Sequence, residues 1–140
     1  MNKASVDRDI PAAYEALKDA EIVQDGKIDA GFRGQIATFG AAVSMGSLLS
    51  AIAFFSEKNK SDVPREKLLD ALFRILQSHG MDSEYKNLYQ YAAANPGCRE
   101  EVLNAAIALK LAINLYPKRE NKKRDGTDQP DQPEQPDQRE

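Results

Sequence analysis

Residues 34–56 read GQIATFGAAVSMGSLLSAIAFFS and contain no charged side chain, although 29% of the chain is charged. A helix that crosses a bilayer needs about 20 predominantly apolar residues, so this stretch is long enough to be a membrane helix. The same composition is typical of helices buried at the centre of a helical domain. The choice between these two interpretations decides the fold.

Three features favour a pair of buried helices. Met45-Gly46 interrupts the apolar pattern, and Ser44 and Ser47 lie at the same point, where a membrane helix would face hydrocarbon. Lysine and arginine flank the stretch on both sides, without the asymmetry that orients membrane helices. The later segment 102–116 is apolar nearly all round but short for a membrane span, so it needs a partner to pack on. We therefore expect two buried helices and no membrane contact.

The first of these helices should begin near Asp29 and bury one face. Apolar residues spaced i, i+4, i+7 and i+11 form a buried stripe, namely Phe32, Ile36, Phe39 and Val43. A second line at intervals of four contains only small residues and would allow a close approach by another backbone, namely Ala30, Gly34, Thr38 and Ala42. Gly46 suits the left-handed position that ends a helix, and Ser47 caps the next helix, which carries Leu48, Leu49, Ile52 and Phe55.

The remaining segments are also helical by pattern. Asp9 should cap a first helix that starts at Pro11 and ends at Asp25-Gly26, with no strands beside that turn. Further helices are expected to begin near residues 61–64, 82–83 and 95–96, and His79-Gly80 should end the fourth. The prediction is an all-α, compact single-domain bundle of about six helices over residues 1–117. Residues 118–140 have no apolar side chain, are first basic and then acidic, and predict a disordered tail.

No catalytic or cofactor-binding motif is present. A catalytic thiol would need a histidine and an orienting third group, so Cys98 is expected to be inert and His79 to complete a helix C-terminus. Helix capping and the helix dipole account for the neighbouring carboxylates Asp7, Asp9, Glu100 and Glu101. There is no phosphate-binding glycine loop and no Cys/His metal cluster. The prediction is a protein without enzymatic activity, cofactor or metal; the single cysteine and the absence of a signal sequence favour the cytoplasm.

Several cations and aromatic rings are candidates for contacts with phosphates and bases, although a solvated surface is the usual explanation for such cations. Arg33 lies on an otherwise uncharged helix, and three cations crowd the fourth helix, namely Arg65, Lys67 and Arg74. Lys110 falls in an apolar helix, where an unpaired charge is costly, so it must reach water, pair with a carboxylate or face a groove. The rings of Tyr85, Tyr89 and Tyr91 suit base stacking, but Tyr85, Leu88 and Ala92 fit a stripe that faces the core, which favours packing.

The uncharged stretch also resembles a known family. The residues that carry the resemblance are Phe32-Arg33-Gly34-Gln35-Ile36, Thr38-Phe39-Gly40-Ala41-Ala42-Val43, Gly46-Ser47-Leu48-Leu49 and Ala53-Phe54-Phe55. Together they are similar to the signature of the small helical subunit of type III-B CRISPR effector complexes, the Cmr complex. The later agreement lies in Arg65, Lys67-Leu68-Leu69, residues 72–76, Arg99-Glu100-Glu101 and residues 105–110. The resemblance spans residues 10–117, with one departure at Ser50, where relatives often carry proline.

The resemblance implies an all-helical subunit of an antiviral complex, without an active site. Its partners would be other subunits, copies of itself on which it stacks, and the guide and target RNA. Arginine and lysine would contact phosphates independently of sequence, and the candidates for this role are Arg33, Lys58, Arg65, Lys67, Arg74 and Lys110. Two alternatives stay open: a small membrane-anchored helical protein, and a helical adaptor that contacts only proteins.

Overall fold

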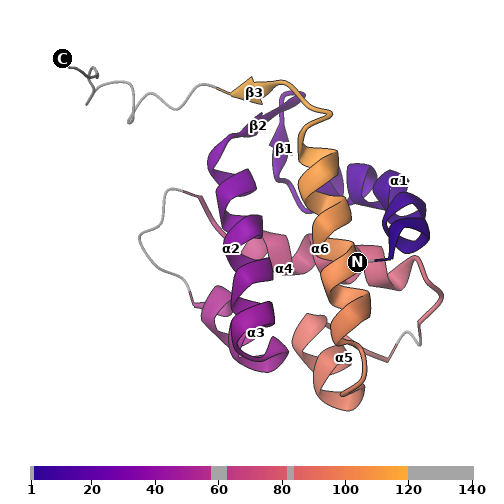
Figure 1. Ribbon diagram of the computed structural model, residues 1–140. Coiled ribbons are helices and arrows are strands. Elements are labelled where there is room, and N and C mark those ends of the chain that lie inside the picture. The colour runs from indigo at the N-terminus through magenta and orange to yellow at the C-terminus, as the bar shows by residue number, and fades with distance from the viewer. Residues whose placement is uncertain (1, 58–62, 82–83, 120–140) are drawn as a thin grey trace.

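The computed structural model describes residues 2–57, 63–81 and 84–119, and these form six helices and a small sheet (Figure 1). The helices are α1 (Lys3–Asp19), α2 (Gly31–Met45), α3 (Leu48–Ser56), α4 (Glu66–Gln77), α5 (Leu88–Ala94) and α6 (Arg99–Ile113). The strands are β1 (Val23–Gln24), β2 (Lys27–Asp29) and β3 (Lys118–Arg119). The predicted all-α fold of about six helices is confirmed. Residues 120–140, which make up most of the predicted tail, lie outside the described residues.

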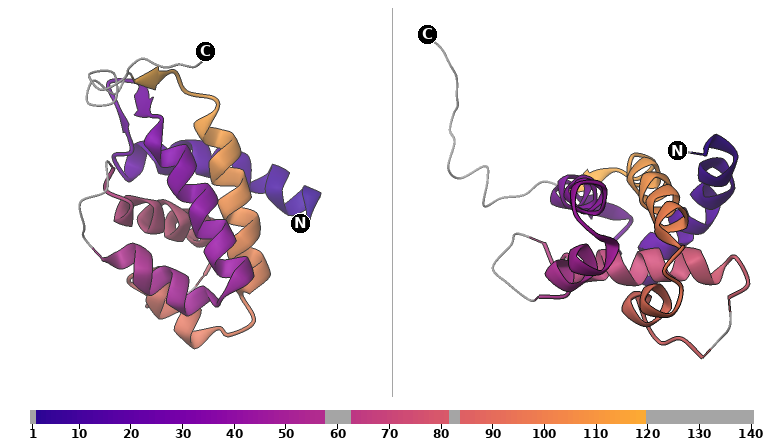
Figure 2. Two further views of the ribbon diagram at one scale, coloured as in Figure 1. Left: turned by 60° about the vertical axis from the view of Figure 1, so that its left-hand side comes forward. Right: turned by 60° about the horizontal axis from the view of Figure 1, so that its bottom comes forward.

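Helix α6 is the central element, as its composition predicts. It contacts α1, α2 and α4, and α2 lies beside it while α4 crosses behind both (Figures 1 and 2). A helix with neighbours on several sides must be apolar on all of those sides. Its buried apolar residues are accordingly Val102, Ala105, Ala106, Ala108, Leu109, Ala112 and Ile113.

The uncharged stretch is divided between α2 and α3. The predicted stripe from Phe32 to Val43 is buried, and the rings of Phe39 and Phe55 meet edge to face with centroids 5.2 Å apart. Ser47 caps α3, since its hydroxyl oxygen accepts a hydrogen bond of 3.1 Å from the amide of Ser50. In the described part of the chain, no helix combines the length and the apolar character that crossing a membrane requires.

The glycine between these helices serves a different purpose from the one predicted. Gly46 has φ −128°, so the expected left-handed conformation is wrong. A Cβ atom at this position would lie only 3.0 Å from the carbonyl oxygen of Ala42. The tight passage of the chain past the last turn of α2 therefore explains the glycine, because any side chain would force that carbonyl to move.

Helix α1 begins eight residues earlier than Pro11, at Lys3, and contains this proline in its interior. The side chain of Asn2 caps it by accepting a hydrogen bond of 3.1 Å from the amide of Ser5. The inward side chains Val6, Ala13 and Leu17 follow a helical spacing that runs across the proline, and their burial offsets the hydrogen bond that proline removes. Asp9 is therefore a buried residue within a helix and not its cap.

The Asp25-Gly26 turn joins two strands, which corrects the expectation that no strands flank it. Both residues have positive φ, 56° and 73°, as a two-residue hairpin of type I′ requires. The hairpin pairs Val23 with Ile28, and β3 adds to β2 in parallel. The sequence concealed this sheet because strands of two or three residues are too short to show alternation. The two residues of β3 also belong to the segment predicted as tail.

The later helices begin further along the chain than predicted. Helix α5 starts at Leu88 instead of residues 82–83, because the side chain of Asn87 caps it at the amide of Gln90, 2.9 Å away. A turn over residues 95–98 precedes α6, which begins at Arg99. Helix α4 starts at Glu66, and the capping residues predicted for it at 61–62 lie outside the described residues. Its predicted apolar face is buried, and Gly80 follows it with φ +88°.

Candidate functional site

The structure divides the candidate RNA-binding cations between two sides of the bundle. Arg33 belongs to α2 and Lys110 to α6, the adjacent helices at the front in Figure 1. The other three described cations, Arg65, Lys67 and Arg74, belong to α4 or directly precede it, and α4 crosses behind. Lys58 lies outside the described residues.

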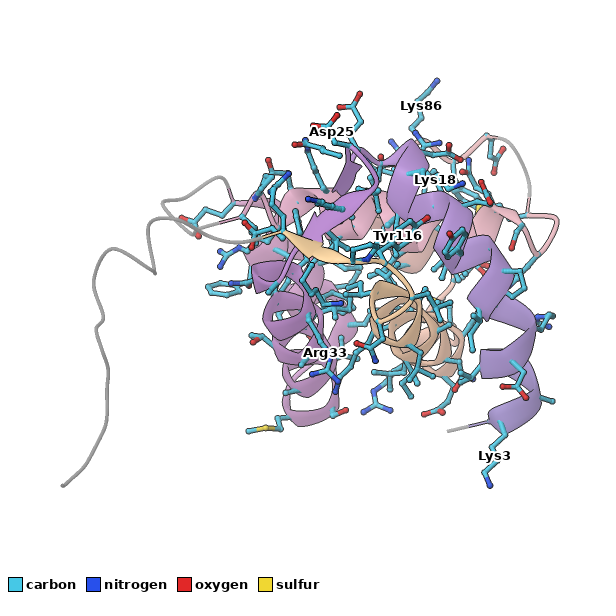
Figure 3. The ribbon with its side chains drawn as sticks, turned by 90° about the horizontal axis from the view of Figure 1, so that it is seen from above. Lys3, Lys18, Asp25, Arg33, Lys86 and Tyr116 are labelled. Atoms are coloured by element: carbon cyan, nitrogen blue, oxygen red, sulfur yellow. The ribbon has the colours of Figure 1, made fainter. Side chains whose placement is uncertain are left out.

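Arg33 and Lys110 lie close together where α2 begins and α6 ends. The Nε atom of Arg33 donates a hydrogen bond of 3.0 Å to Oδ1 of Asn114. Lys110 precedes Asn114 by four residues, so it lies on the same side of α6 about 6 Å along the axis. Neither cation has a carboxylate partner within the described ranges. Figure 3 places Arg33 on the side of the molecule away from Lys86 and Asp25. The result is a small region of positive charge that no carboxylate of the described residues neutralises.

A groove of about 340 Å³ runs between α2 and α6, and Lys110 is the one of these two cations that lines it. Small side chains of α2 form one wall, and Leu103 and Ile107 of α6 contribute to the other. Lys110 lines the groove together with Glu100, and these two residues lie ten positions apart on the same helix. Of the three possibilities for Lys110, the structure supports two together: the residue is half-buried, it lines the groove, and the described residues provide no carboxylate partner for it.

The predicted close approach of another backbone to the line of small residues on α2 is wrong. Gly34 and Thr38 are exposed, and the hydroxyl of Thr38 donates to the carbonyl oxygen of Gly34 at 3.0 Å. A Cβ added to Gly34 would meet nothing within 4 Å. Helix α2 packs through its apolar stripe instead, because that stripe buries more apolar surface than a line of small residues would.

The cations of α4 are engaged within the chain. Arg65 is only 6% exposed; its guanidinium lies 4.2 Å from the centre of the Phe54 ring, and its Nη2 donates to the Phe54 carbonyl oxygen at 3.0 Å. Lys67 donates to the carbonyl oxygen of Glu21 at 3.1 Å, and Arg74 pairs with Asp70 at 3.2 Å. Burial removes Arg65 from the surface on which RNA would bind, so its expected role changes from phosphate contact to packing.

A cluster of ionisable side chains at the other end of α6 did not emerge from the sequence. His79 follows α4, and its Nε2 lies 2.7 Å from Oδ1 of Asp9 on α1. Its Nδ1 lies 2.6 Å from Oε2 of Glu101 on α6, and the hydroxyl of Tyr91 on α5 donates to Oε1 of the same carboxylate at 2.6 Å. We refer to Asp9, His79, Tyr91 and Glu101 as the histidine cluster.

A correct start for α1 would have revealed part of this cluster. With α1 beginning at Lys3, Asp9 falls three residues after Val6 and four before Ala13, on the buried face of the helix. A carboxylate on such a face needs a hydrogen-bonded partner, and the 19 Lys and Arg and the single His of the chain are the possible cationic ones. The predicted role of Glu101 at the start of α6 is compatible with the structure, but it leaves out the contacts with His79 and Tyr91.

The surroundings shift the pKa values of three groups in and beside the cluster. Burial lowers the pKa of His79, but the hydrogen bonds to Glu101 and Asp9 and the charge of Asp9 outweigh it, so the pKa lies above its usual 6.5. Burial and the contact with Glu101 raise the pKa of Tyr91, which stays protonated and donates. Burial, together with the Glu101 charge, raises the pKa of Cys98, so its thiol is a poor nucleophile at neutral pH.

Comparisons of the chain with models of protein families, with curated proteins and with solved structures found no match. Within the described ranges, no group of three or more His, Cys, Asp or Glu side chains is arranged to hold a metal ion. The functional proposal therefore depends on the residues of this chain and on the resemblance described above.

Proposed function

We propose that this chain is a non-catalytic, RNA-binding subunit of an RNA-guided effector complex of the type III-B CRISPR class. It would help to hold target RNA against the guide in antiviral defence and would stack on copies of itself. The observation that carries the RNA-binding part is the pair Arg33 and Lys110, for which the described residues provide no carboxylate partner. Arg33 bonds to Asn114, one turn beyond Lys110, and Lys110 lines a groove. The proposed membership of the complex and the other proposed partners rest on the resemblance over residues 10–117.

The two cations suit contact with a phosphate backbone for electrostatic reasons. The whole chain has a formal net charge of −3, so attraction to RNA has to come from a local region and not from the total charge. Lys110 is half-buried beside apolar walls, where a charge interacts more strongly than in open water. Contacts of this kind bind phosphates irrespective of base, which is what a subunit needs when base pairing with a guide supplies the specificity.

Charge reversal at both positions tests this proposal. The double variant Arg33→Glu/Lys110→Glu should bind a labelled single-stranded RNA about tenfold more weakly at low salt than the unaltered chain, since two phosphate contacts are lost. The slope of log K against log salt should also become shallower by about 1.4, at roughly 0.7 for each phosphate contact. Fluorescence anisotropy at several salt concentrations measures both quantities.

The matched control is Lys18→Glu/Lys86→Glu, which changes the net charge equally at exposed positions on the opposite side in Figure 3. It should alter RNA affinity much less than the first double variant. Equal weakening by both variants would mean that the binding depends on total charge, and unchanged binding in the first variant would remove Arg33 and Lys110 from the site. Circular dichroism verifies that each variant keeps its helical content.

A further inference from the structure

The histidine cluster connects elements that are distant in the sequence. Asp9 on α1 is 1% exposed and His79 after α4 is 14% exposed at its side chain, so this contact is shielded from water. Glu101 attaches the other ring nitrogen to α6. The groups that face the imidazole from the packed elements are Arg8 and Asp9 of α1 and Glu101 of α6, with Tyr91 and Cys98 adjoining Glu101.

The two ring nitrogens of His79 have different hydrogen-bond partners available once the ring loses a proton. Protonated His79 has an N–H on both nitrogens, and each donates to one carboxylate. The neutral ring keeps one N–H. Its other nitrogen then carries a lone pair, which must accept a hydrogen bond, because a lone pair that faces a carboxylate oxygen is repelled by it. Nη2 of Arg8 lies 3.2 Å from Nε2 and offers that nitrogen a donor, whereas the described residues provide no such donor at Nδ1. The neutral ring therefore keeps its bond to Glu101 and gives up its bond to Asp9.

Asp9 has little else to hold it once that bond is lost. Its Oδ2 is buried and has no hydrogen-bond partner in the described structure, and its Oδ1 retains only Nε of Arg8 at 3.4 Å. Pro11, two residues further along α1, lacks the N–H that would bond to the carbonyl of residue 7. Helix α1 therefore lacks one backbone hydrogen bond between its first half and residues 12–19, and the burial of Val6 and the bond from the Asn2 amide to Oδ1 of Asn104 are further contacts of that half.

We propose that His79 acts as a pH-sensitive clamp, which holds the first half of α1 against the bundle when protonated and releases it when neutral. This inference is independent of RNA binding. The direction follows from linkage: the contact with Asp9 raises the pKa of His79 in the closed state, so protonation of the ring stabilises that state at low pH. That contribution is lost as pH rises through the folded pKa. Release therefore occurs on the alkaline side, and α6 stays in place throughout.

Two measurements on the full chain test the clamp. The ring signals of His79, the single histidine of the sequence, report its pKa by NMR, and we expect a midpoint above 6.5. Hydrogen exchange reports protection factors, which correct for the effect of pH on intrinsic exchange. Protection of residues 3–10 should fall as the pH rises through that midpoint, whereas protection of residues 102–112 should stay constant.

Two variants separate the clamp from a general loss of stability. In His79→Gln, which does not titrate, the protection factors of residues 3–10 should be independent of pH between 5.5 and 8.5, a window chosen around the usual histidine pKa of about 6.5. Arg8→Gln removes a cation that lowers the pKa of His79, so the midpoint should move to higher pH. A midpoint at or below 6.5, or pH-independent protection of residues 3–10 in the unaltered chain, would overturn the proposal. A loss of protection in α6 in place of α1 would also overturn it. All of these results come from the unaltered chain, so they test the proposal even if His79→Gln does not fold.

Discussion

Replacing Phe39 with alanine should lower the free energy of unfolding by about 3 to 5 kcal/mol, the range typical of a large aromatic residue removed from a core. Phe39 is fully buried in α2, and its ring packs edge to face on Phe55 of α3. The side chain therefore joins the two helices that make up the uncharged stretch. Its loss removes buried apolar area and leaves a cavity that these two helices cannot readily close.

Urea unfolding followed by circular dichroism measures this effect. Met45→Ala is the matched control, because Met45 ends the same helix and is 88% exposed. Substitution at such an exposed position should change the free energy of unfolding by no more than about 0.5 kcal/mol. If Phe39→Ala were as mild as Met45→Ala, the uncharged stretch would not be the core of a helical bundle.

Replacing Arg65 with alanine should cost about 2 to 3 kcal/mol of unfolding free energy and leave RNA affinity unchanged. A desolvated cation–π contact contributes about 2 kcal/mol, and a hydrogen bond to a charged group about 1.5 to 3. Arg65 makes both contacts with Phe54. The two contributions do not add fully, because Nε of Arg65 is buried without a hydrogen-bond partner in the described structure.

Arg65→Lys is the informative control for this prediction. Lysine keeps the positive charge but lacks the planar guanidinium that lies over the ring while donating to the carbonyl oxygen of Phe54. We expect it to recover less than half of the lost stability in urea unfolding. Anisotropy measurements on folded Arg65→Ala should give the RNA affinity of the unaltered chain. A fall in affinity comparable to that of Arg33→Glu/Lys110→Glu would return Arg65 to the RNA site.

The parts of the fold that could be predicted are those with a long, regular apolar pattern. The stripe of α2, the Ser47 cap of α3 and the all-round apolar character of α6 each extend over a turn or more, so the pattern identifies the element and its buried face. Single local signals misled the prediction. Pro11 suggested a helix start, whereas the burial of residues on both sides of it keeps α1 continuous.

The candidate sites depend on contacts between distant elements, and a sequence pattern does not contain these. Arg65 and Arg33 both read as surface cations, and only the position of Phe54 distinguishes the buried one from the exposed one. The histidine cluster likewise needs α1, α5 and α6 to converge after α4 ends. The surroundings of Lys110 could be predicted in part. Its position in an apolar helix already indicated that its charge must lie beside a groove, a carboxylate or water.

Purification of the tagged chain from its native host, with sequencing of the bound RNA and identification of the bound proteins, tests the central claim most directly. We expect short guide RNAs derived from CRISPR arrays to accompany the chain, together with several other subunits of one complex. Protein partners without any RNA would contradict it and favour an adaptor. Recovery from membranes only with detergent would also contradict it, because the uncharged stretch would then lie in lipid.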